Sequence, residues 1–289
     1  MKDELEGRSD APRAAQIVGF EPCGLVTLLT DFGTSDTFVG VMKGVLWGRS
    51  RRLRAAIDLT HAIAAQDVED AALHLAEARP WFPAGTVHVA VVDPGVGSSR
   101  AILAALDGGH LFLAPDNGLL TPVLGAGARV WRVDPARFGL TPPSRTFHGR
   151  DVFAPVAAAL VDGCDPSSVG LRAEKWQVLP MTAPQPLGAG RVRGQIRRVD
   201  RFGNLISNLD ADGLERLRGE LAKAPRAQFQ VRVGEVYAPL VDTYADAAKG
   251  APLALLNSSG WVEVAVRDGD AARLLGVSRG APIVLEPVP

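Results

Sequence analysis

Short apolar runs alternate with helical segments over residues 24–133 of the chain. The runs LVTLL, AAIDL and TVHVAVV are predicted strands, and the segments TFVGVMKGVLWG and QDVEDAALHLAEARPWF are predicted helices. The second helical segment places apolar residues at helical spacing, namely Val68, Ala71, Ala72 and Leu75. This helix should therefore pack one face on a sheet. The alternation predicts an α/β domain with a mostly parallel sheet and Rossmann-like layers.

Two further runs, in AILAALDGGHLFLA, are predicted to form a hairpin that turns at Asp107, Gly108 and Gly109. Glycine adopts positive φ without steric cost, which suits such a turn. The PDNG stretch that follows, residues 115–118, is predicted to be a loop at a strand end.

The pattern changes in the last third of the chain to a period of two residues. Phe229, Val231 and Val233 alternate with polar neighbours, and the run WVEVAV alternates in the same way. We therefore predict a mostly β second domain, with one short helix that begins after Asp270 and ends at Gly276.

These patterns divide the chain into four segments. A Pro- and Gly-rich stretch without periodicity separates the two halves and is typical of a linker. The predicted boundaries are a flexible N-terminal tail at 1–17, an α/β domain at 18–180, a linker at 181–190 and a β domain at 191–289.

The charges of the chain nearly cancel, with 31 basic and 32 acidic residues and a formal net charge of -1. No overall field would draw the protein to nucleic acid or to an anionic membrane. Cys23 and Cys164 are the only cysteines, which favours a reducing cytoplasm over a disulfide scaffold. The charged N-terminus lacks the apolar core of a signal peptide, and no stretch is long enough to span a membrane.

Polar residues follow several predicted strands, where ligands bind in open α/β sheets. Asp31 follows LVTLL and could accept two hydrogen bonds from a ribose diol. Asp36, a few residues on, is interpreted as the cap of the next helix. The turn DPGVGSSR brings Asp93 and Arg100 close to a ligand, and it lacks the lysine of a Walker loop and the third glycine of a dinucleotide fingerprint.

The stretch TFHGRD contains the histidine best suited to proton transfer, His148, because Gly149 beside it allows close approach of a ligand. Asp151 could cap the following helix and pair with Arg150, a structural role that we weigh equally with a functional one. No histidines share the spacing of a metal-binding helix, so no metal is expected. In the second half DRFGN and NSSG could be plain β-turns by composition.

Six motifs in this order, TDFG, DPGVGSSR, PDNG, TFHGRD, DRFGN and NSSG, resemble those of the S-adenosylmethionine (SAM) hydroxide adenosyltransferases. That family is the water-using relative of the fluorinase and chlorinase enzymes. The resemblance runs from about Leu25 to the C-terminus. It implies an N-terminal α/β domain, a C-terminal β-barrel domain and a homotrimer with its sites between subunits. It also implies that SAM is the substrate and that no cofactor is needed.

The resemblance assigns substrate-binding roles at matching positions of this sequence. Asp31 resembles the residue that holds the ribose hydroxyls. Asp200 and Ser258 resemble those that fix the methionine amino and carboxylate groups, and Phe202 and Asn204 match positions that contact the adenine. Ser259 stands where the halogenases carry an arginine, so the grip on the methionine carboxylate should differ.

The water-using members carry an Asp, Arg and His triad that matches Asp93, Arg100 and His148. The fluorinase instead has a tyrosine at the position of Asp93 and a fluoride-binding serine at that of Gly149. A carboxylate in the pocket would also repel a halide. We therefore expect water to attack C5′ of SAM and to release adenosine and L-methionine. The alternatives are a chlorinase-like halogenase and a non-catalytic protein that binds SAM or adenosine.

Overall fold

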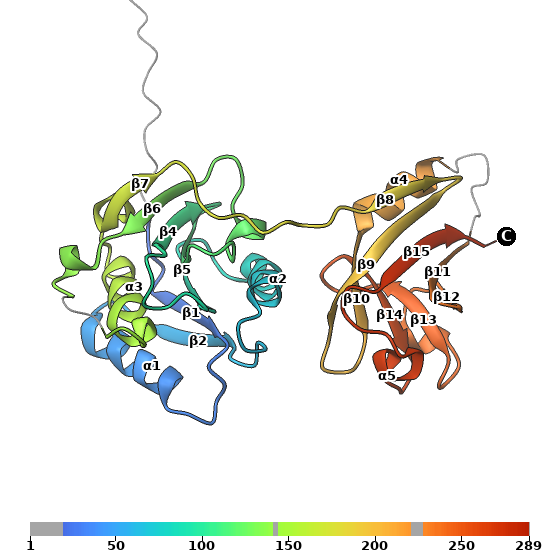
Figure 1. Ribbon diagram of the computed structural model, residues 1–289, viewed down its shortest axis with the longest axis horizontal. Helices are drawn as coiled ribbons and strands as arrows, with labels where there is room; N and C mark the ends of the chain where they lie inside the picture. The colour runs from blue at the N-terminus through green and yellow to red at the C-terminus, as the bar shows by residue number, and fades with distance from the viewer. Residues whose placement is uncertain (1–19, 141–143, 221–227, 289) are drawn as a thin grey trace, which may run out of the picture. The chain divides into compact units, whose positions relative to one another are not determined.

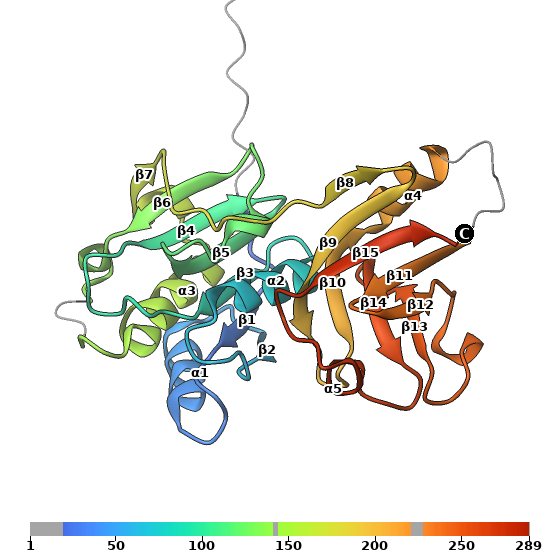
Figure 2. The ribbon, with the colours of Figure 1, turned by 45° about the vertical axis from the view of Figure 1, so that its right-hand side comes forward.

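The computed structural model describes residues 20–140, 144–220 and 228–288. The chain forms two compact units that divide between Val178 and Leu179, and Figures 1 and 2 show the elements of each. The predicted N-terminal tail, residues 1–17, lies outside the described residues. No helix in the described part of the chain combines the length and the apolar character needed to cross a membrane.

The first unit is built on one seven-stranded sheet with the order β2-β1-β3-β5-β4-β6-β7 (Figure 1). Its strands are β1 (Leu25–Thr30), β2 (Ala55–Thr60), β3 (Val87–Val91), β4 (Ile102–Asp107), β5 (His110–Pro115), β6 (Arg129–Val133) and β7 (Gly170–Ala173). The pairs β1/β2, β1/β3 and β3/β5 are parallel, whereas β4 and β7 run against their neighbours. The mostly parallel sheet predicted from the sequence is confirmed.

Helices cover both faces of this sheet. They are α1 (Phe38–Arg49), α2 (Val68–Ala78) and α3 (Ala154–Val161), and a π-helical turn at Gly149–Phe153 leads into α3. Met42 of α1 shares a buried cluster with Val26 of β1 and with α3, whereas Leu75 of α2 packs with Leu29 of β1. Val26 and Leu29 point to opposite faces because side chains alternate along a strand. Three layers result.

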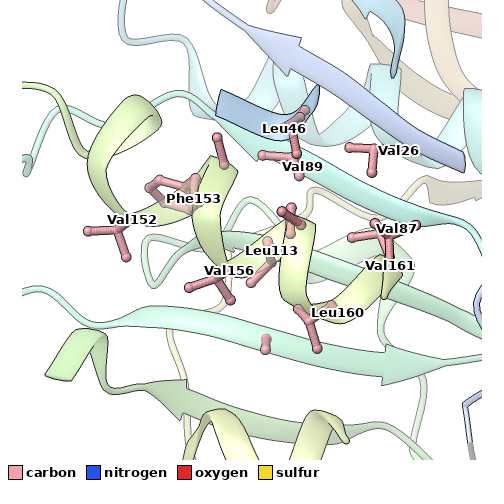
Figure 3. Packing of buried hydrophobic residues seen from close by; sticks show 14 of the residues in the cluster. Val26, Leu46, Val87, Val89, Leu113, Val152, Phe153, Val156, Leu160 and Val161 are labelled. Carbon is pink, nitrogen blue, oxygen red and sulfur yellow. The ribbon is translucent and has the colours of Figure 1, made fainter. Parts of the chain in front are cut away.

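Figure 3 shows the face of the sheet that α3 covers. Val156 and Leu160 of the helix lie among side chains of the strands, including Val89 and Leu113, and all four are at most 1% exposed. The sequence of α3, APVAAALV, is apolar on every side, as expected for a helix buried between a sheet and a second helix.

Local predictions for the first unit have mixed outcomes. The hairpin of β4 and β5 turns at Gly108 and Gly109, which both have positive φ, and α2 buries the predicted alanines and Leu75. The interpretation of Asp36 as a helix cap is wrong. Helix α1 begins after Thr37 and has no side-chain cap, so Asp36 is simply an exposed turn residue.

The second unit is an antiparallel, nearly closed barrel with the order β12-β11-β15-β9-β10-β14-β13. Its strands are β8 (Gln185–Gly188), β9 (Arg191–Val199), β10 (Leu205–Asp210), β11 (Phe229–Val233), β12 (Val236–Pro239), β13 (Pro252–Leu256), β14 (Trp261–Val266) and β15 (Pro282–Pro287), and its helices are α4 (Ala211–Glu220) and α5 (Ala271–Leu275). A bridge between Leu240 and Ala254 connects the two edge strands. The predicted barrel is confirmed.

Strand β11 alternates buried and half-buried residues as predicted, and α5 is capped by Asp270 and ended by Gly276 in the left-handed conformation. The alternation predicted for β14 is wrong, because Glu263 and Ala265 are buried as well. Val241 packs against the cluster that contains Ala265, so this strand is covered on both faces.

The predicted linker at 181–190 is not wholly irregular. Residues 185–188 form β8, which pairs with β9 through Gln185↔Arg193 and Pro186↔Val192. Proline is tolerated in β8 because, among the described strands, β8 pairs with β9 alone and leaves its other edge open. The Pro and Gly content that suggested a linker therefore also fits a short edge strand of the second unit.

Candidate active site

A pocket of about 420 Å³ opens at the carboxyl ends of β1 and β3 in the first unit. Asp31 follows β1 directly, and Asp93 follows β3 after one residue. Because β1 and β3 are parallel neighbours, their ends meet at one edge of the sheet. His148 reaches the same pocket from the turn before the π-helical segment. Three residues that are far apart in the sequence thus line one cavity.

Asp93, Arg100 and His148 form a connected group. Nε of Arg100 donates to Oδ1 of Asp93 at 2.8 Å, and its Nη2 donates to the other carboxylate oxygen. Nη2 also lies 3.0 Å from Nδ1 of His148. The side chains of Asp93 and Arg100 are only 5% and 11% exposed, so this ion pair is largely shielded from solvent. Asp93 and His148 line the pocket, and Arg100 joins them.

The bond from Arg100 fixes the tautomer of His148. A guanidinium has no acceptor, so Nδ1 of His148 must accept the hydrogen bond. Burial lowers the pKa of His148 below its ordinary value, and the positive charge of Arg100 lowers it further, against the opposing effect of Asp93. The neutral ring then carries its proton on Nε2. His148 is therefore a hydrogen-bond donor through Nε2.

Asp151 holds the turn that carries His148. Its carboxylate accepts from the backbone N–H of Ser144 at 2.9 Å and pairs with Arg150 at 2.6 Å. The hydrogen bond from Arg150 lowers the pKa of Asp151 to about 2. The pairing with Arg150 is as predicted. The predicted cap of α3 is wrong, because α3 has no side-chain cap and Asp151 instead accepts from the backbone N–H of Ser144 in the preceding turn.

Asp31 lies on the pocket wall beside Gln66. Its Oδ2 accepts from the backbone N–H of Gln66 at 2.9 Å, which leaves the remaining lone pairs of the carboxylate for a ligand. Gln66 has φ of 68°, a left-handed conformation that is rare for a side chain of this size. Such strain often occurs at binding sites. No pattern in the sequence had pointed to Gln66.

Three phenylalanines form an aromatic wall of the pocket. The rings of Phe32, Phe38 and Phe147 meet edge to face, with centroids 5.2 to 6.2 Å apart. Gly149 lies against this wall, and a Cβ there would come within 3.0 Å of Met42 Sδ and 3.1 to 3.2 Å of two of the rings. A serine at this position would therefore have to displace its neighbours.

Asp116 and Asn117, which also follow a strand, do not line this pocket. Asn117 donates to the carbonyl of Val92 at 2.8 Å, and Asp116 accepts from the backbone N–H of Gln177 at 2.7 Å. Asn117 thus supports the segment that leads to Asp93, whereas Asp116 holds the backbone at Gln177. Among the described residues no group of three or more His, Cys, Asp or Glu side chains is arranged to hold a metal ion.

In the second unit Asp200 and Asn204 belong to one turn. The carboxylate of Asp200 accepts from the backbone N–H groups of Phe202 and Asn204 at 2.8 and 2.9 Å and from the Asn204 side chain at 3.0 Å. The ring of Phe202 is 75% exposed. The turn is therefore held by its own side chains, and it exposes an aromatic ring.

Ser258 is exposed in a second turn, which Asn257 stabilises by accepting from the backbone N–H of Ser259 at 3.0 Å. Sequence reasoning missed two residues nearby. Glu263 is only 3% exposed and accepts from the hydroxyl of Tyr244 at 2.6 Å. A glutamate in the middle of the apolar run WVEVAV was the available signal.

Comparison with known proteins identifies the family. Residues 26–170 match the model of the SAM hydroxide adenosyltransferase N-terminal domain, and residues 194–284 match that of its C-terminal domain. The chain belongs to the SAM hydroxide adenosyltransferase family. The family named from six short motifs is thereby confirmed.

Several curated relatives of this family member carry a functional name. The (R)-S-adenosyl-L-methionine hydrolase of Thermus thermophilus is 39% identical over 271 residues, which cover 90% of this chain and 98% of the relative. The protein of the same name from Salinispora arenicola is 40% identical and covers 88% and 95%. A fluorinase of Actinoplanes is more distant, at 25% identity, with coverage of 83% and 90%.

Two solved structures share the fold of this SAM hydroxide adenosyltransferase family member. An uncharacterized conserved protein from Thermotoga maritima aligns with a TM-score of 0.82 and 34% identity, covering 90% of this chain and 99% of the other. A conserved hypothetical protein from Thermus thermophilus aligns with a TM-score of 0.70 and 37% identity, covering 91% and 99%.

Proposed function

We propose that this protein hydrolyses SAM, with water attacking C5′ to give adenosine and L-methionine. The family match over both units and the SAM hydrolase names of relatives at 31–40% identity support this activity. The observation that carries the proposal is the connected Asp93–Arg100–His148 group on the wall of the pocket that also contains Asp31. The fluorinases of Actinoplanes and Actinopolyspora mzabensis are more distant relatives, at 25% and 24% identity.

The relatives' name suggests which form of SAM is the substrate. The name gives the methionine as L and adds the prefix (R). We read this prefix as the configuration at the sulfonium sulfur, which is also a stereocentre. We propose that the protein acts on the (R) epimer at sulfur. Such a preference would give the destruction of SAM a purpose, since it would remove one epimer and spare the other.

The proposed reaction balances without an external acid. The C5′–S bond breaks with its electron pair on sulfur, so the positive sulfonium leaves as the neutral thioether of methionine. Oxygen of water bonds to C5′, and the water loses one proton. The enzyme therefore has to activate the nucleophile, because water has a pKa of about 15.7.

His148 and Asp93 would share the activation of water. Nδ1 of neutral His148 is occupied by Arg100, so its Nε2–H would be the group that donates to the developing hydroxide. Asp93 is the acceptor on the pocket wall and would receive the proton. Arg100 would hold both groups in place. The aromatic wall of Phe32, Phe38 and Phe147 would keep bulk solvent from the reacting atoms.

Two features favour water over a halide. The carboxylate of Asp93 repels an anion in the pocket. A side chain at Gly149 would require small movements of Met42, Phe32 and Phe147, so the pocket is packed for glycine at this position and not for a halide-binding hydroxyl. Halogenation is therefore a poor fit to this pocket.

We further propose that the second unit supplies the groups that bind the rest of the substrate. By family resemblance Asp200 and Ser258 would bind the methionine end, and Phe202 and Asn204 would contact the adenine. The exposed Phe202 ring and the exposed Ser258 are accessible to a ligand. These roles, like those of Asp31 and the triad, remain proposals.

The family resemblance also leads us to propose a homotrimer. Helix α1 supports an assembly because it exposes apolar side chains, with Phe38 43%, Val41 37% and Trp47 54% exposed. Large exposed apolar side chains are typical of contact surfaces. Light scattering should give the mass of three chains, and Trp47→Glu should lower it.

A cytoplasmic location is part of the same proposal. Cys23 and Cys164 are both unpaired in the structure, as expected for a reducing compartment. Fractionation of cells that make the protein would test the location directly.

The decisive experiment uses purified protein and each sulfonium epimer of SAM in ¹⁸O-labelled water, with and without chloride. Adenosine labelled at O5′ is expected, faster from the (R) epimer. A 5′-chloro product would indicate a halogenase, and binding without turnover would indicate a SAM- or adenosine-binding protein. Asp93→Asn should abolish turnover, whereas Asp107→Asn, which alters the pair of Asp107 on β4 with Arg79, should retain it.

A further inference from the structure

A chain of polar groups lies behind Asp31 and has no part in the proposed reaction. Thr30 and His61 are buried, whereas the side chains of Asp58 and Lys43 are 40% and 31% exposed. Oγ1 of Thr30 lies 2.8 Å from Nδ1 of His61, and these residues are 0% and 5% exposed. Nε2 of His61 lies 3.0 Å from Oδ1 of Asp58, at ion-pair distance but without hydrogen-bond alignment. Lys43 of α1 donates to Oδ2 of Asp58 at 2.6 Å. The chain thus runs from helix α1 to the end of β1.

Thr30 and the backbone of His61 bind the two N–H groups that directly follow Asp31. The N–H of Phe32 donates to Oγ1 of Thr30 at 3.2 Å, and the N–H of Gly33 donates to the carbonyl of His61 at 2.8 Å. Two peptide groups of the turn that carries Asp31 are therefore held by Thr30 and His61. The Asp31 carboxylate itself is oriented by Gln66, five residues after His61.

The donor and acceptor roles of Asp58, His61 and Thr30 are consistent with one another. A carboxylate only accepts, so the proton of a neutral His61 belongs on Nε2, facing Asp58. Nδ1 then accepts from the hydroxyl of Thr30, whose oxygen accepts from Phe32. Burial alone would raise the pKa of Asp58, but its contacts with Lys43 and His61 outweigh this effect and lower the pKa. Asp58 therefore stays ionised.

We propose that the Asp58–His61–Thr30 chain fixes the turn that presents Asp31, and that His61 and Thr30 are positioning residues for substrate binding. Neither lines the pocket among the described residues, so they would act through Asp31. This inference rests on the proposed function, in which Asp31 holds the ribose hydroxyls. Small displacements of such a group weaken binding because hydrogen bonds to a diol require close alignment.

Strand β1 contains a matched control. Oγ1 of Thr27 lies 2.8 Å from Nδ1 of His88, and both side chains are fully buried. The contact has the same atoms, distance and burial as that of Thr30 with His61. It lies three residues earlier on the strand, away from Asp31. A purely structural role predicts the same consequences for the two pairs, whereas a positioning role distinguishes them.

The test compares steady-state kinetics and adenosine affinity in hydroxyl-deletion variants. Thr30→Val should raise KM for SAM and Kd for adenosine about tenfold, with kcat changed less than about threefold. Thr30→Ser, which keeps the hydroxyl, should restore both. Thr27→Val should lower the melting temperature and leave KM and Kd unchanged. Equal KM values for the two valine variants would overturn the proposal.

A double-mutant cycle shows whether the effect passes through Asp31. In an Asp31→Asn background Thr30→Val should raise Kd for adenosine less than about twofold, because the group it positions is already disabled. A full tenfold effect in that background would also overturn the proposal. If Thr30→Val does not fold, His61→Asn and His61→Gln serve instead. Asn keeps a polar atom near Nδ1 and should bind adenosine more tightly than Gln, and the reverse order would refute the inference.

The outcomes separate this inference from the proposed function. If the unmodified protein neither binds adenosine nor turns over SAM, the proposed function fails. If it does both and Thr30→Val matches Thr27→Val, only the positioning role fails.

Discussion

His88 should make the first unit sensitive to mild acid. Its ring is fully buried and stacks on Phe112 at 5.2 Å with an interplanar angle of 17°. Nδ1 contacts Thr27 at 2.8 Å, and Nε2 contacts Nδ1 of His110 at 3.1 Å. Burial lowers the pKa of His88 to about 3, with smaller contributions from the charges of His110 and Arg79.

The size of the effect follows from linkage. In the unfolded chain a histidine has a pKa of about 6.5 and takes up a proton below that pH, whereas folded His88 stays neutral. The contribution of neutral His88 to stability is therefore complete above about pH 6.5 and is lost as the pH falls toward about 3. At pH 5, about 1.5 units below the pKa in the unfolded chain, protonation of this histidine stabilises the unfolded state. The free energy of unfolding therefore falls by about 2 kcal/mol.

Urea unfolding at pH 7.5 and pH 5.0 would measure this loss. A Trp261→Phe background leaves tryptophans only in the first unit, so fluorescence then reports that unit. His88→Gln should reduce the difference in unfolding free energy between pH 7.5 and pH 5.0 by about 2 kcal/mol, whatever the stability of the variant at pH 7.5. His74→Gln, a control whose side chain is 32% exposed, should keep the difference. An unchanged difference in His88→Gln would refute the reasoning.

Four further predictions concern single sites. Gly149→Ala should reduce kcat/KM at least about tenfold in steady-state assays with folding retained, because its Cβ would crowd the aromatic wall. The lowered pKa of His148 keeps the ring neutral, so a pH profile should show kcat sustained as pH falls through 6.5 and lost only below it. Gln66→Gly keeps the backbone donor to Asp31 and relieves the positive φ, so calorimetry should find no fall in melting temperature, whereas Gln66→Pro should weaken adenosine binding. Asp270→Ala removes the cap of α5 and should lower the unfolding free energy of the second unit by about 1 kcal/mol in urea.

The family and most elements of the fold could be predicted from the sequence because their signals are local. Glycine supplies the positive φ at the turn between β4 and β5, and Asp270 and Gly276 bound α5 through contacts within a few residues. Side-chain periodicity distinguished α2 from the strands for the same reason. Prediction failed where the local composition was compatible with two structures. Residues 185–188 of the expected linker form β8, and Asp36 caps no helix.

The sequence by itself determined the two-unit organisation, the parallel sheet with a barrel, and the residue types of the candidate site. Only the tertiary structure decided how those residues act together. Arg100 bonds to both Asp93 and His148, and the tautomer of His148 follows from that contact. Glu263 is buried and accepts a hydrogen bond from Tyr244, 19 residues earlier in the chain. Such features depend on contacts between residues far apart in the chain, which hydrophobic periodicity cannot specify because it reports only which face of each element is buried.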